Sequence, residues 1–251
     1  AFARKRSGKK RGVFEPSAPK AIEDIECKKC MTTVMRLLTP AARGCVGGNG
    51  TVVPTSSGRA PTAFCETLLP KKRQCIVYSF GMNNVWDFDR EMIKKGCRVI
   101  SFDPFCCGGA HRIGENHDFV PVGLAPYDGI TDSDDVTRPN TTYPVMSIRT
   151  IMQSYGHAKL DVLRMKVSSN KEWKGLKSLI NTGIIQDVRQ LSISMQMSNN
   201  DEWEEYKTVV SGLRQSGFFP FYVAKQSNSV FMKIQEGALS LHNAYEVSYG
   251  N

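Results

Sequence analysis

The chain has 251 residues, 41% of them apolar and 23% charged, which is ordinary for a globular protein and fits one sizeable α/β domain with an N-terminal extension. The formal net charge is +9, but residues 1–20 carry seven basic side chains and one acid, so they account for +6 and leave +3 for the rest. This distribution excludes a broad basic face on the fold. We expect residues 1–25 to form a basic, disordered tail, and any contact with nucleic acid or acidic lipid to be limited to that tail.

No apolar run in the sequence approaches the ~20 residues that span a bilayer, and no signal-peptide segment remains. The sequence starts at Ala1 rather than Met, which is typical of a processed or trimmed chain. A membrane anchor upstream of Ala1, as in a trimmed type II membrane protein, is therefore one expectation.

Half of the eight cysteines lie in a cysteine-containing N-terminal extension over residues 26–69, namely Cys27, Cys30, Cys45 and Cys65. An even number of cysteines in an irregular segment is typical of disulfide stapling. Sequons for N-glycosylation begin at Asn49 and Asn140 and agree with a secretory route. We predict a secretory or extracellular location, with the cytoplasm as the alternative.

Two observations bear on metal binding. Cys27 and Cys30 have the spacing of half a zinc site, but a second pair at that spacing and nearby histidines are absent from the sequence. Asp132, Asp134 and Asp135 resemble a cation loop, although a solvated polar loop is the preferred interpretation. No metal site is predicted.

The segment before residue 70 contains one helix-like stretch. Apolar side chains over residues 26–38 have helical spacing, which Pro40 ends, and residues 41–62 are rich in Gly, Pro, Ser and Thr, which predicts turns and short strands. The main domain is expected over residues 70–251.

The segment from Cys75 to Asp103 is the most informative part of the chain. It reads as an apolar strand, a tight turn at Gly81, an amphipathic helix, a second apolar strand and an acid at that strand's end. This βαβ unit is the building block of nucleotide-type cofactor pockets, where backbone N–H groups of the turn and a carboxylate after the second strand meet the cofactor.

Strands and helices alternate after Asp103. The predicted strands are Phe119–Leu124, Leu160–Val167 and Val188–Met197, and the predicted helices are Val145–Tyr155, Lys171–Ile180 and Asp201–Gln215. A polar loop is expected over Ala125–Pro144. An antiparallel finish is expected from Phe218–Val223, Val230–Ile234 and Tyr245–Tyr249. The alternation predicts an α/β fold with a mostly parallel sheet and helices on both faces.

The turn at Gly81 bears on the choice of cofactor. A nicotinamide site usually has three glycines, so that the backbone can pack on a pyrophosphate, but Gly81 is followed by Met82, Asn83 and Asn84. The turn therefore argues against a diphosphate cofactor. S-adenosyl-L-methionine has no phosphate and tolerates a turn with fewer glycines.

Several segments, in order, resemble one family: Tyr78-Ser79-Phe80-Gly81, Trp86 to Asp89, Ser101-Phe102-Asp103-Pro104, Asp161 to Met165, Glu172-Trp173 and Tyr245-Glu246-Val247. They are similar to the methyltransferase-like protein 24 family of class I S-adenosylmethionine-dependent methyltransferases. The resemblance covers most of residues 74–251. It implies a Rossmann-like class I methyltransferase fold with a seven-stranded, mostly parallel sheet.

The resemblance also implies roles for individual residues. Ser79, Phe80 and Gly81 would border the methionine part of the cofactor, and Asn83 belongs to the same turn. Asp103 would hold the ribose hydroxyls through charge-assisted bonds. Phe102 and Pro104 would flank the adenine. The structural alternative is that Asp103 merely ends a strand in an ordinary turn before Pro104.

The chain departs from the family pattern at polar site positions. Where relatives commonly have Met-Asp-Ile-Glu-Gly, this sequence has Met165-Lys166-Val167-Ser168-Ser169, and where they have Glu and His it has Ser194 and Gln196. These changes remove the obvious bases. Lys166 is a weak candidate for a catalytic base, because that role requires burial that strongly lowers its pKa. A lysine at a strand end more often extends into solvent.

The histidines and two adjacent cysteines are weaker candidates. No Ser/His/Asp sequence pattern accompanies the histidines, so we interpret each as a surface or packing residue; they are His111, His117, His157 and His242. Cys106 and Cys107 could be redox-active as a pair, but pairing with other cysteines is the preferred interpretation.

Two hypotheses follow from the sequence. In the first, the protein transfers a methyl group from S-adenosyl-L-methionine to an oxygen or nitrogen of an unknown acceptor. In the second, it is a catalytically inactive pseudo-methyltransferase that acts as a binding or scaffolding module.

Overall fold

The computed structural model describes residues 27–48, 50–133, 138, 140–227, 229, 231–234 and 238–251. The predicted disordered tail over residues 1–25, the sequon residue Asn49, and Asp134 and Asp135 of the predicted polar loop lie outside this part of the chain. No helix within it is both long enough and apolar enough to cross a bilayer.

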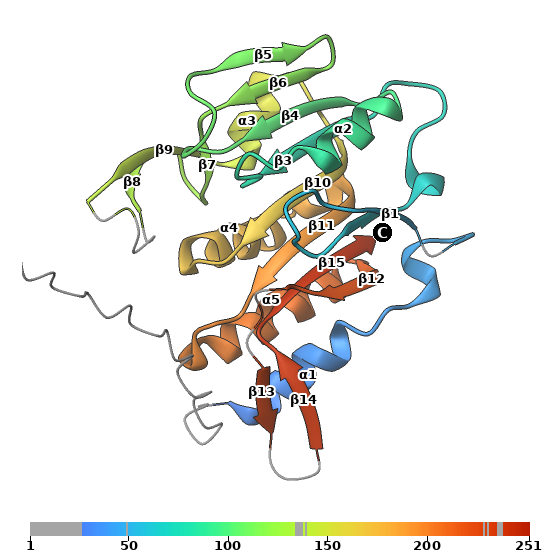
Figure 1. Ribbon diagram of the computed structural model, residues 1–251, viewed down its shortest axis with the longest axis vertical. Helices are drawn as coiled ribbons and strands as arrows, with labels where there is room; N and C mark the ends of the chain where they lie inside the picture. Colours follow the sequence, from blue (N-terminus) through green and yellow to red (C-terminus); the bar gives the residue numbers. More distant parts are fainter. Residues whose placement is uncertain are drawn as a thin grey trace, which may run out of the picture.

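A large twisted sheet forms the centre of the molecule, with strand order β12-β15-β11-β10-β3-β4-β6-β5 (Figure 1). Its strands are β3 (Ile76–Phe80), β4 (Arg98–Phe102), β5 (His111–Gly114), β6 (His117–Val120), β10 (Leu160–Val167), β11 (Val188–Gln196), β12 (Phe219–Lys225) and β15 (Ala244–Gly250). The five strands from β6 to β11 are parallel, and β15 is antiparallel to both of its neighbours. This arrangement confirms the Rossmann-like prediction. The eighth strand, β5, is an antiparallel addition at the edge.

Helices cover both faces of the sheet, as predicted. Successive strand residues point to opposite faces, so Val162 packs with α2 (Asp87–Lys94) on one face, whereas Leu163 and Met165 pack in the larger core on the other. That larger core also contains α3 (Ile148–Ser154), α4 (Asn170–Asn181) and α5 (Trp203–Gln215). The first helix, α1 (Lys28–Leu37), packs against α5.

The face that carries α2 is completed by the N-terminal extension. Strands β1 (Thr51–Val53) and β2 (Thr62–Phe64) form a hairpin, followed by a 3-10 turn, η3 (Glu66–Leu68). Phe64 and Val53 belong to the same hydrophobic cluster as Phe88 of α2. The extension is thus part of the packed sheet face.

Two parts of the chain differ from the predicted elements. Pro121 has no N–H for a strand ladder, and the predicted strand Phe119–Leu124 is divided into β6 and β7 (Gly123–Leu124). The predicted loop Ala125–Pro144 contains β8 (Gly129–Asp132) and most of β9 (Thr142–Met146), which join β7 in a small sheet of order β7-β9-β8. Because β9 extends to Met146, the following helix starts at Ile148 rather than Val145.

The predicted antiparallel finish is also divided. β12 and β15 complete the large sheet, whereas β13 (Phe231–Ile234) pairs only with β14 (Ala238–His242) in a separate two-stranded sheet. Figure 1 shows this pair below the large sheet.

All eight cysteines form disulfides, in the pairs Cys27–Cys30, Cys45–Cys65, Cys75–Cys97 and Cys106–Cys107. Two of the pairs staple the extension, as predicted. The expectation that Cys106 and Cys107 pair with other cysteines was wrong. Cys75 and Cys97 precede β3 and β4 at one edge of the sheet, whereas Cys106 and Cys107 follow β4 at the opposite edge, so each pair closes locally.

Candidate functional site

The chain turns sharply at the carboxyl end of β3. Gly81 has φ +70° and donates its N–H to the carbonyl oxygen of Phe102 at 2.9 Å, which ties the turn to the end of β4. A Cβ atom at this position would lie 3.1 Å from Cβ of Lys166. Both the left-handed backbone and the close approach therefore require glycine here.

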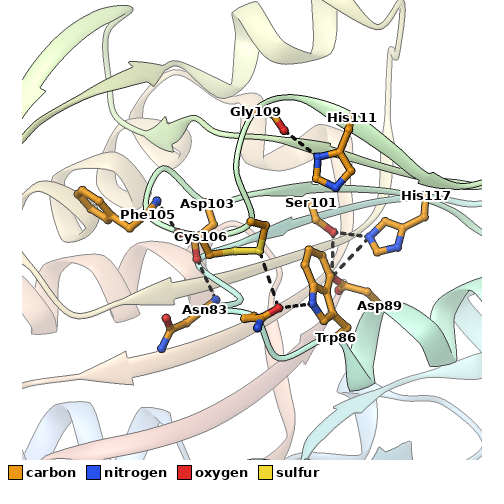
Figure 2. Close-up of a disulfide and its surroundings, with 12 residues drawn as sticks. Asn83, Trp86, Asp89, Ser101, Asp103, Phe105, Cys106, Gly109, His111 and His117 are labelled. Atoms are coloured by element: carbon orange, nitrogen blue, oxygen red, sulfur yellow. Dashed lines mark hydrogen bonds and ion pairs between the residues drawn. A yellow bond between two sulfur atoms is a disulfide. The ribbon is translucent and has the colours of Figure 1, made fainter.

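Asp103 follows β4 and is only 5% exposed. Its Oδ2 accepts the backbone N–H of Asn83 at 2.8 Å, and its Oδ1 accepts that of Phe105 at 2.9 Å (Figure 2). These two bonds fix the carboxylate between the turn after β3 and the turn after β4. Because each carboxylate oxygen has two lone pairs, both can still accept a hydroxyl donor.

A cavity of about 460 Å³ opens beside this carboxylate, and we call it the cofactor cleft. It is lined by six of the seven residues predicted to bind cofactor, namely Phe80, Gly81, Asn83, Phe102, Asp103 and Pro104. Ser79, the seventh, is fully buried and does not line the cleft. Its Oγ lies 3.3 Å from Nη1 of Arg164, and both side chains lie on the sheet face opposite to Phe80. The volume lies in the range typical of small-molecule sites.

The small β7-β9-β8 sheet contributes a wall of the cleft that the sequence did not predict. The ring of Tyr143 packs edge-on against Phe105, with ring centroids 4.8 Å apart, and Arg138 lies 4.4 Å above the same Phe105 ring. Gly123 makes room for Tyr143, since a Cβ there would lie 2.7 Å from the tyrosine ring. The only sequence signal was an aromatic residue inside a segment otherwise polar enough to predict a loop.

The end of β10 forms the third side of the cleft. Lys166 lines it with an exposed side chain, so the burial that a lysine base requires is absent. Glu172 of α4 also lines the cleft, and its Oε2 accepts the backbone N–H of Ser168 at 2.6 Å and that of Ser169 at 2.8 Å. An acid is thus present four residues after Ser168 and six after Lys166, the two positions where the family pattern places acids.

A second, much smaller cavity of about 20 Å³ meets the cofactor cleft at Phe80, Gly81 and Lys166, and we call it the acceptor-side cavity. Glu246 of β15 lies at its base and is only 2% exposed. Its Oε1 accepts the hydroxyl of Thr62 at 3.0 Å, from the N-terminal hairpin.

Three further contacts complete the surroundings of Glu246. Ser192 donates to Oε1 at 3.2 Å, and Gln226 donates to Oε2 at 3.0 Å. Burial raises the pKa of Glu246, while the nearby Arg164 opposes that shift. Sequence reasoning missed this site, although an acid within the apolar strand 244–250 was a signal.

Hydrogen bonds from β2 to the sheet explain why the acceptor-side cavity is so small. Gln190 exchanges two bonds with the backbone of Cys65, at 2.7 and 3.0 Å, and Ser248 accepts the N–H of Ala63 at 3.3 Å. These polar side chains of β11 and β15 hold the hairpin against the face of the sheet, and the Thr62–Glu246 bond holds it at the cavity itself.

The structure brings together a serine, a histidine and an aspartate that are scattered in the sequence. Ser101 Oγ lies 2.8 Å from both Asp89 Oδ2 and His117 Nε2 (Figure 2). Ser101 and Asp89 are completely buried, so the hydroxyl cannot reach a substrate. Burial also lowers the pKa of His117, as expected for a packing residue.

Comparisons with known proteins identify a family. A family model described as a methyltransferase domain matches residues 51–249. No curated protein matches the chain by sequence.

The chain also matches two solved structures at low identity. One is precorrin 8W decarboxylase, the product of gene MT0146 of Methanobacterium thermoautotrophicum, with 10% identity and a TM-score of 0.36 over 71% of this chain and 82% of that chain. The other is precorrin-6y C5,15-methyltransferase from Geobacter metallireducens GS-15, with 8% identity and a TM-score of 0.36 over 74% of this chain and 85% of that chain. The fold assignment rests on the strand order and the family match.

Proposed function

The chain belongs to a family of methyltransferase domains, and we propose that it binds S-adenosyl-L-methionine in the cofactor cleft and transfers the methyl group to an oxygen or nitrogen of an acceptor. The observation that supports this proposal most strongly is the buried carboxylate of Asp103, which lines an open cleft of about 460 Å³. A plugged cleft, or a carboxylate turned to solvent, would have contradicted it.

The residues of the cleft suit an adenosyl group. Asp103 offers acceptor oxygens to the ribose hydroxyls, and Phe102 offers an apolar surface to the adenine. Phe80 stacks on Phe102 with ring centroids 4.4 Å apart, which fixes the floor of the cleft. When bound, S-adenosyl-L-methionine supplies a methyl group made electrophilic by its sulfonium.

The methyl end of the cofactor would lie where the two cavities meet, beside Gly81 and Lys166. The chain's contribution there is to position the reactants, since in-line attack depends on orientation. In this region Glu246 is the carboxylate best suited to act as a general base, because burial raises its pKa.

A specific observation favours the second candidate, a pseudo-methyltransferase that binds cofactor without transferring methyl groups. The acceptor-side cavity holds only about 20 Å³, because the N-terminal hairpin is bonded over it. Methyl transfer would therefore require the hairpin to move away.

Calorimetric titration with S-adenosylhomocysteine tests the cofactor proposal. We expect micromolar binding to the wild type, and a loss of about 30-fold in Asp103→Ala, because hydrogen bonds to a charged group contribute roughly 2 kcal/mol. Asp187→Ala, a carboxylate away from the cleft, is the matched control. Equal affinities in all three proteins would reject the cofactor site.

Methyl transfer is tested separately, with methyl-tritiated S-adenosyl-L-methionine and a panel of phenols, amines and carboxylic acids. Incorporation into one class would identify the enzyme and its acceptor type. A double variant, Cys45→Ser and Cys65→Ser, is expected to release the hairpin. If neither the wild type nor this variant incorporates the methyl group although both bind the cofactor, the binding module is favoured.

We also propose a secretory or extracellular location. The four disulfides and the exposed side chain of Asn140, which begins a sequon, support it. When the protein is expressed through the secretory pathway, we expect Asn140 to carry a glycan. Mass spectrometry should show the added mass, and a glycosidase should remove it.

A further inference from the structure

A second large cavity lies on the far side of the Asp103 turn from the cofactor cleft. It holds about 570 Å³ between the β5–β6 hairpin, the start of α2 and the Cys106–Cys107 disulfide, and we call it the hairpin pocket. Among the described residues, the hairpin pocket and the cofactor cleft have no lining residue in common. Asn83 lines the cleft and its neighbour Asn84 lines the pocket, so the turn after β3 contributes to both spaces.

The walls of the hairpin pocket are mostly apolar. Trp86, Ile93 and Ile113 line it, together with the disulfide ring of Cys106 and Cys107. Ile113 is 44% exposed on an edge hairpin, so its side chain presents an apolar surface to the pocket. Flat and apolar walls of this kind suit a planar ring.

The hydrogen bonding of His111 shows which of its ring nitrogens carries no proton in the neutral ring. Nδ1 lies 2.7 Å from the carbonyl oxygen of Gly109, and because a carbonyl can only accept, Nδ1 carries the proton (Figure 2). In the neutral ring, Nε2 of His111 is therefore an acceptor. His111 lines the hairpin pocket.

The tautomer of His117 is fixed in a similar way. Ser101 donates its only hydroxyl proton to Asp89 Oδ2, so His117 donates Nε2–H to Ser101 Oγ. Nδ1 of His117 is then the bare acceptor. No hydrogen bond to it occurs among the described residues, and His117 also lines the pocket.

Within the described part of the chain, both imidazoles thus have a fixed tautomer and an acceptor nitrogen without a partner, in a mostly apolar cavity whose other polar side chains are Asn84 and Arg90. Binding sites commonly combine such walls with a few convergent polar groups. We propose that the hairpin pocket is a second ligand site, which takes a planar aromatic ring bearing hydroxyl or amino donors. Arg90, which lines the pocket, favours an electron-rich ring through a cation–π contact.

An anionic ligand fits this arrangement less well. Its oxygens would face the acceptor nitrogens of His111 and His117 rather than donors, and burial lowers the pKa of His117, which disfavours its charged form. The titratable and charged groups that influence His117 are Asp89 and Asp118, which raise its pKa, and Arg90 and His111, which lower it.

The test is a calorimetric titration of the whole chain with resorcinol and with 1,3-dimethoxybenzene, which has the same ring without donors. We expect resorcinol to bind and the dimethoxy compound to bind at least tenfold more weakly. His111→Phe keeps a ring on an exposed edge strand and should weaken resorcinol at least tenfold, whereas His157→Gln, a histidine outside the pocket, should leave it unchanged.

Two further measurements keep the result specific. Saturating S-adenosylhomocysteine should not displace resorcinol, because the cofactor cleft is a separate space. Nitrogen-15 spectra of the histidine rings should show Nδ1–H in His111 and Nε2–H in His117, with shifts of the bare nitrogens when resorcinol is added. Competition with S-adenosylhomocysteine, equal binding of both compounds, or full binding by His111→Phe would overturn the proposal.

Discussion

The two halves of the sheet's carboxyl edge differ sharply. At the ends of β3 and β4 the chain leaves an open cleft of about 460 Å³, and backbone N–H groups hold the Asp103 carboxylate inside it. At the carboxyl ends of β10 and β11 and the start of β15 only about 20 Å³ remains, because polar side chains bond to one another and to the N-terminal hairpin. In the proposed function, holding the cofactor and admitting the acceptor would therefore depend on different parts of the sheet edge.

The filled half is held together by satisfied buried polar groups. The Glu246 carboxylate accepts hydrogen bonds from three side chains and is nearly inaccessible to solvent. Such a network stabilises only while it is complete, because every group left without a partner costs about 1–3 kcal/mol. The two halves should consequently respond to mutation in opposite ways.

The largest effect is expected from Glu246→Ala, which leaves three donors without an acceptor. We expect the free energy of unfolding in urea to fall by about 3 kcal/mol. The affinity for S-adenosylhomocysteine should change less than twofold, since Glu246 does not line the cleft. Ser198→Ala, close in sequence to the end of β11 but outside the network, is the control; a loss of cofactor affinity without a loss of stability would contradict the separation of the halves.

The open half is tested by Gly81→Ala. The left-handed φ costs an L-residue about 1–2 kcal/mol, and the new Cβ meets Lys166 beside the cleft, so we expect S-adenosylhomocysteine to bind about tenfold more weakly.

Gly183→Ala is a matched control for this change. Gly183 has φ +74°, and a Cβ added there would have no other atom within 4 Å, so the substitution reproduces the backbone strain away from the cleft. It should lower stability by a similar amount and leave cofactor affinity intact. Equal losses of affinity in the two variants would show that stability alone controls binding.

Lys166→Asp restores an acid where the two halves meet. A carboxylate near the sulfonium should favour S-adenosyl-L-methionine over the uncharged S-adenosylhomocysteine by about threefold to fivefold, the range of an exposed ion pair. The ratio of the two dissociation constants, measured at low salt, checks this expectation. Lys174→Asp, an exposed lysine on α4, should leave the ratio unchanged.

The two halves also differed in how well they could be predicted. The open half comes from a contiguous unit of about thirty residues, so Gly81 and Asp103 could be identified from strand, turn and helix patterns alone. The filled half depends on Thr62 meeting Glu246, 184 residues later, and on Gln190 meeting Cys65, 125 residues earlier. No local pattern carries that information.

Tyr143 shows the same limit within the cleft itself. Its segment has the composition of a loop, and only the small β7-β9-β8 sheet places the ring against Phe105. For Cys106 and Cys107, the sequence favoured partners elsewhere in the chain. The other six cysteines pair among themselves, however, and Cys106 and Cys107 pair with each other. Pairing is decided by which strand ends share an edge.

The smallest expected effect is a pH dependence confined to the filled half. Burial raises the pKa of Glu246 above its ordinary value of 4.5, so the folded chain keeps this proton to a higher pH than the unfolded chain. Its contribution to stability is therefore full below pH 4.5 and is lost as pH rises through the folded-state pKa. Glu246→Gln removes the titration, so the stability of the wild type relative to this variant should fall as pH rises through that window, as measured by urea unfolding at a series of pH values. The pH dependence that the histidines contribute to stability cancels in this difference, because both proteins share them. A difference that does not change with pH would show that Glu246 titrates alike in the folded and unfolded chain.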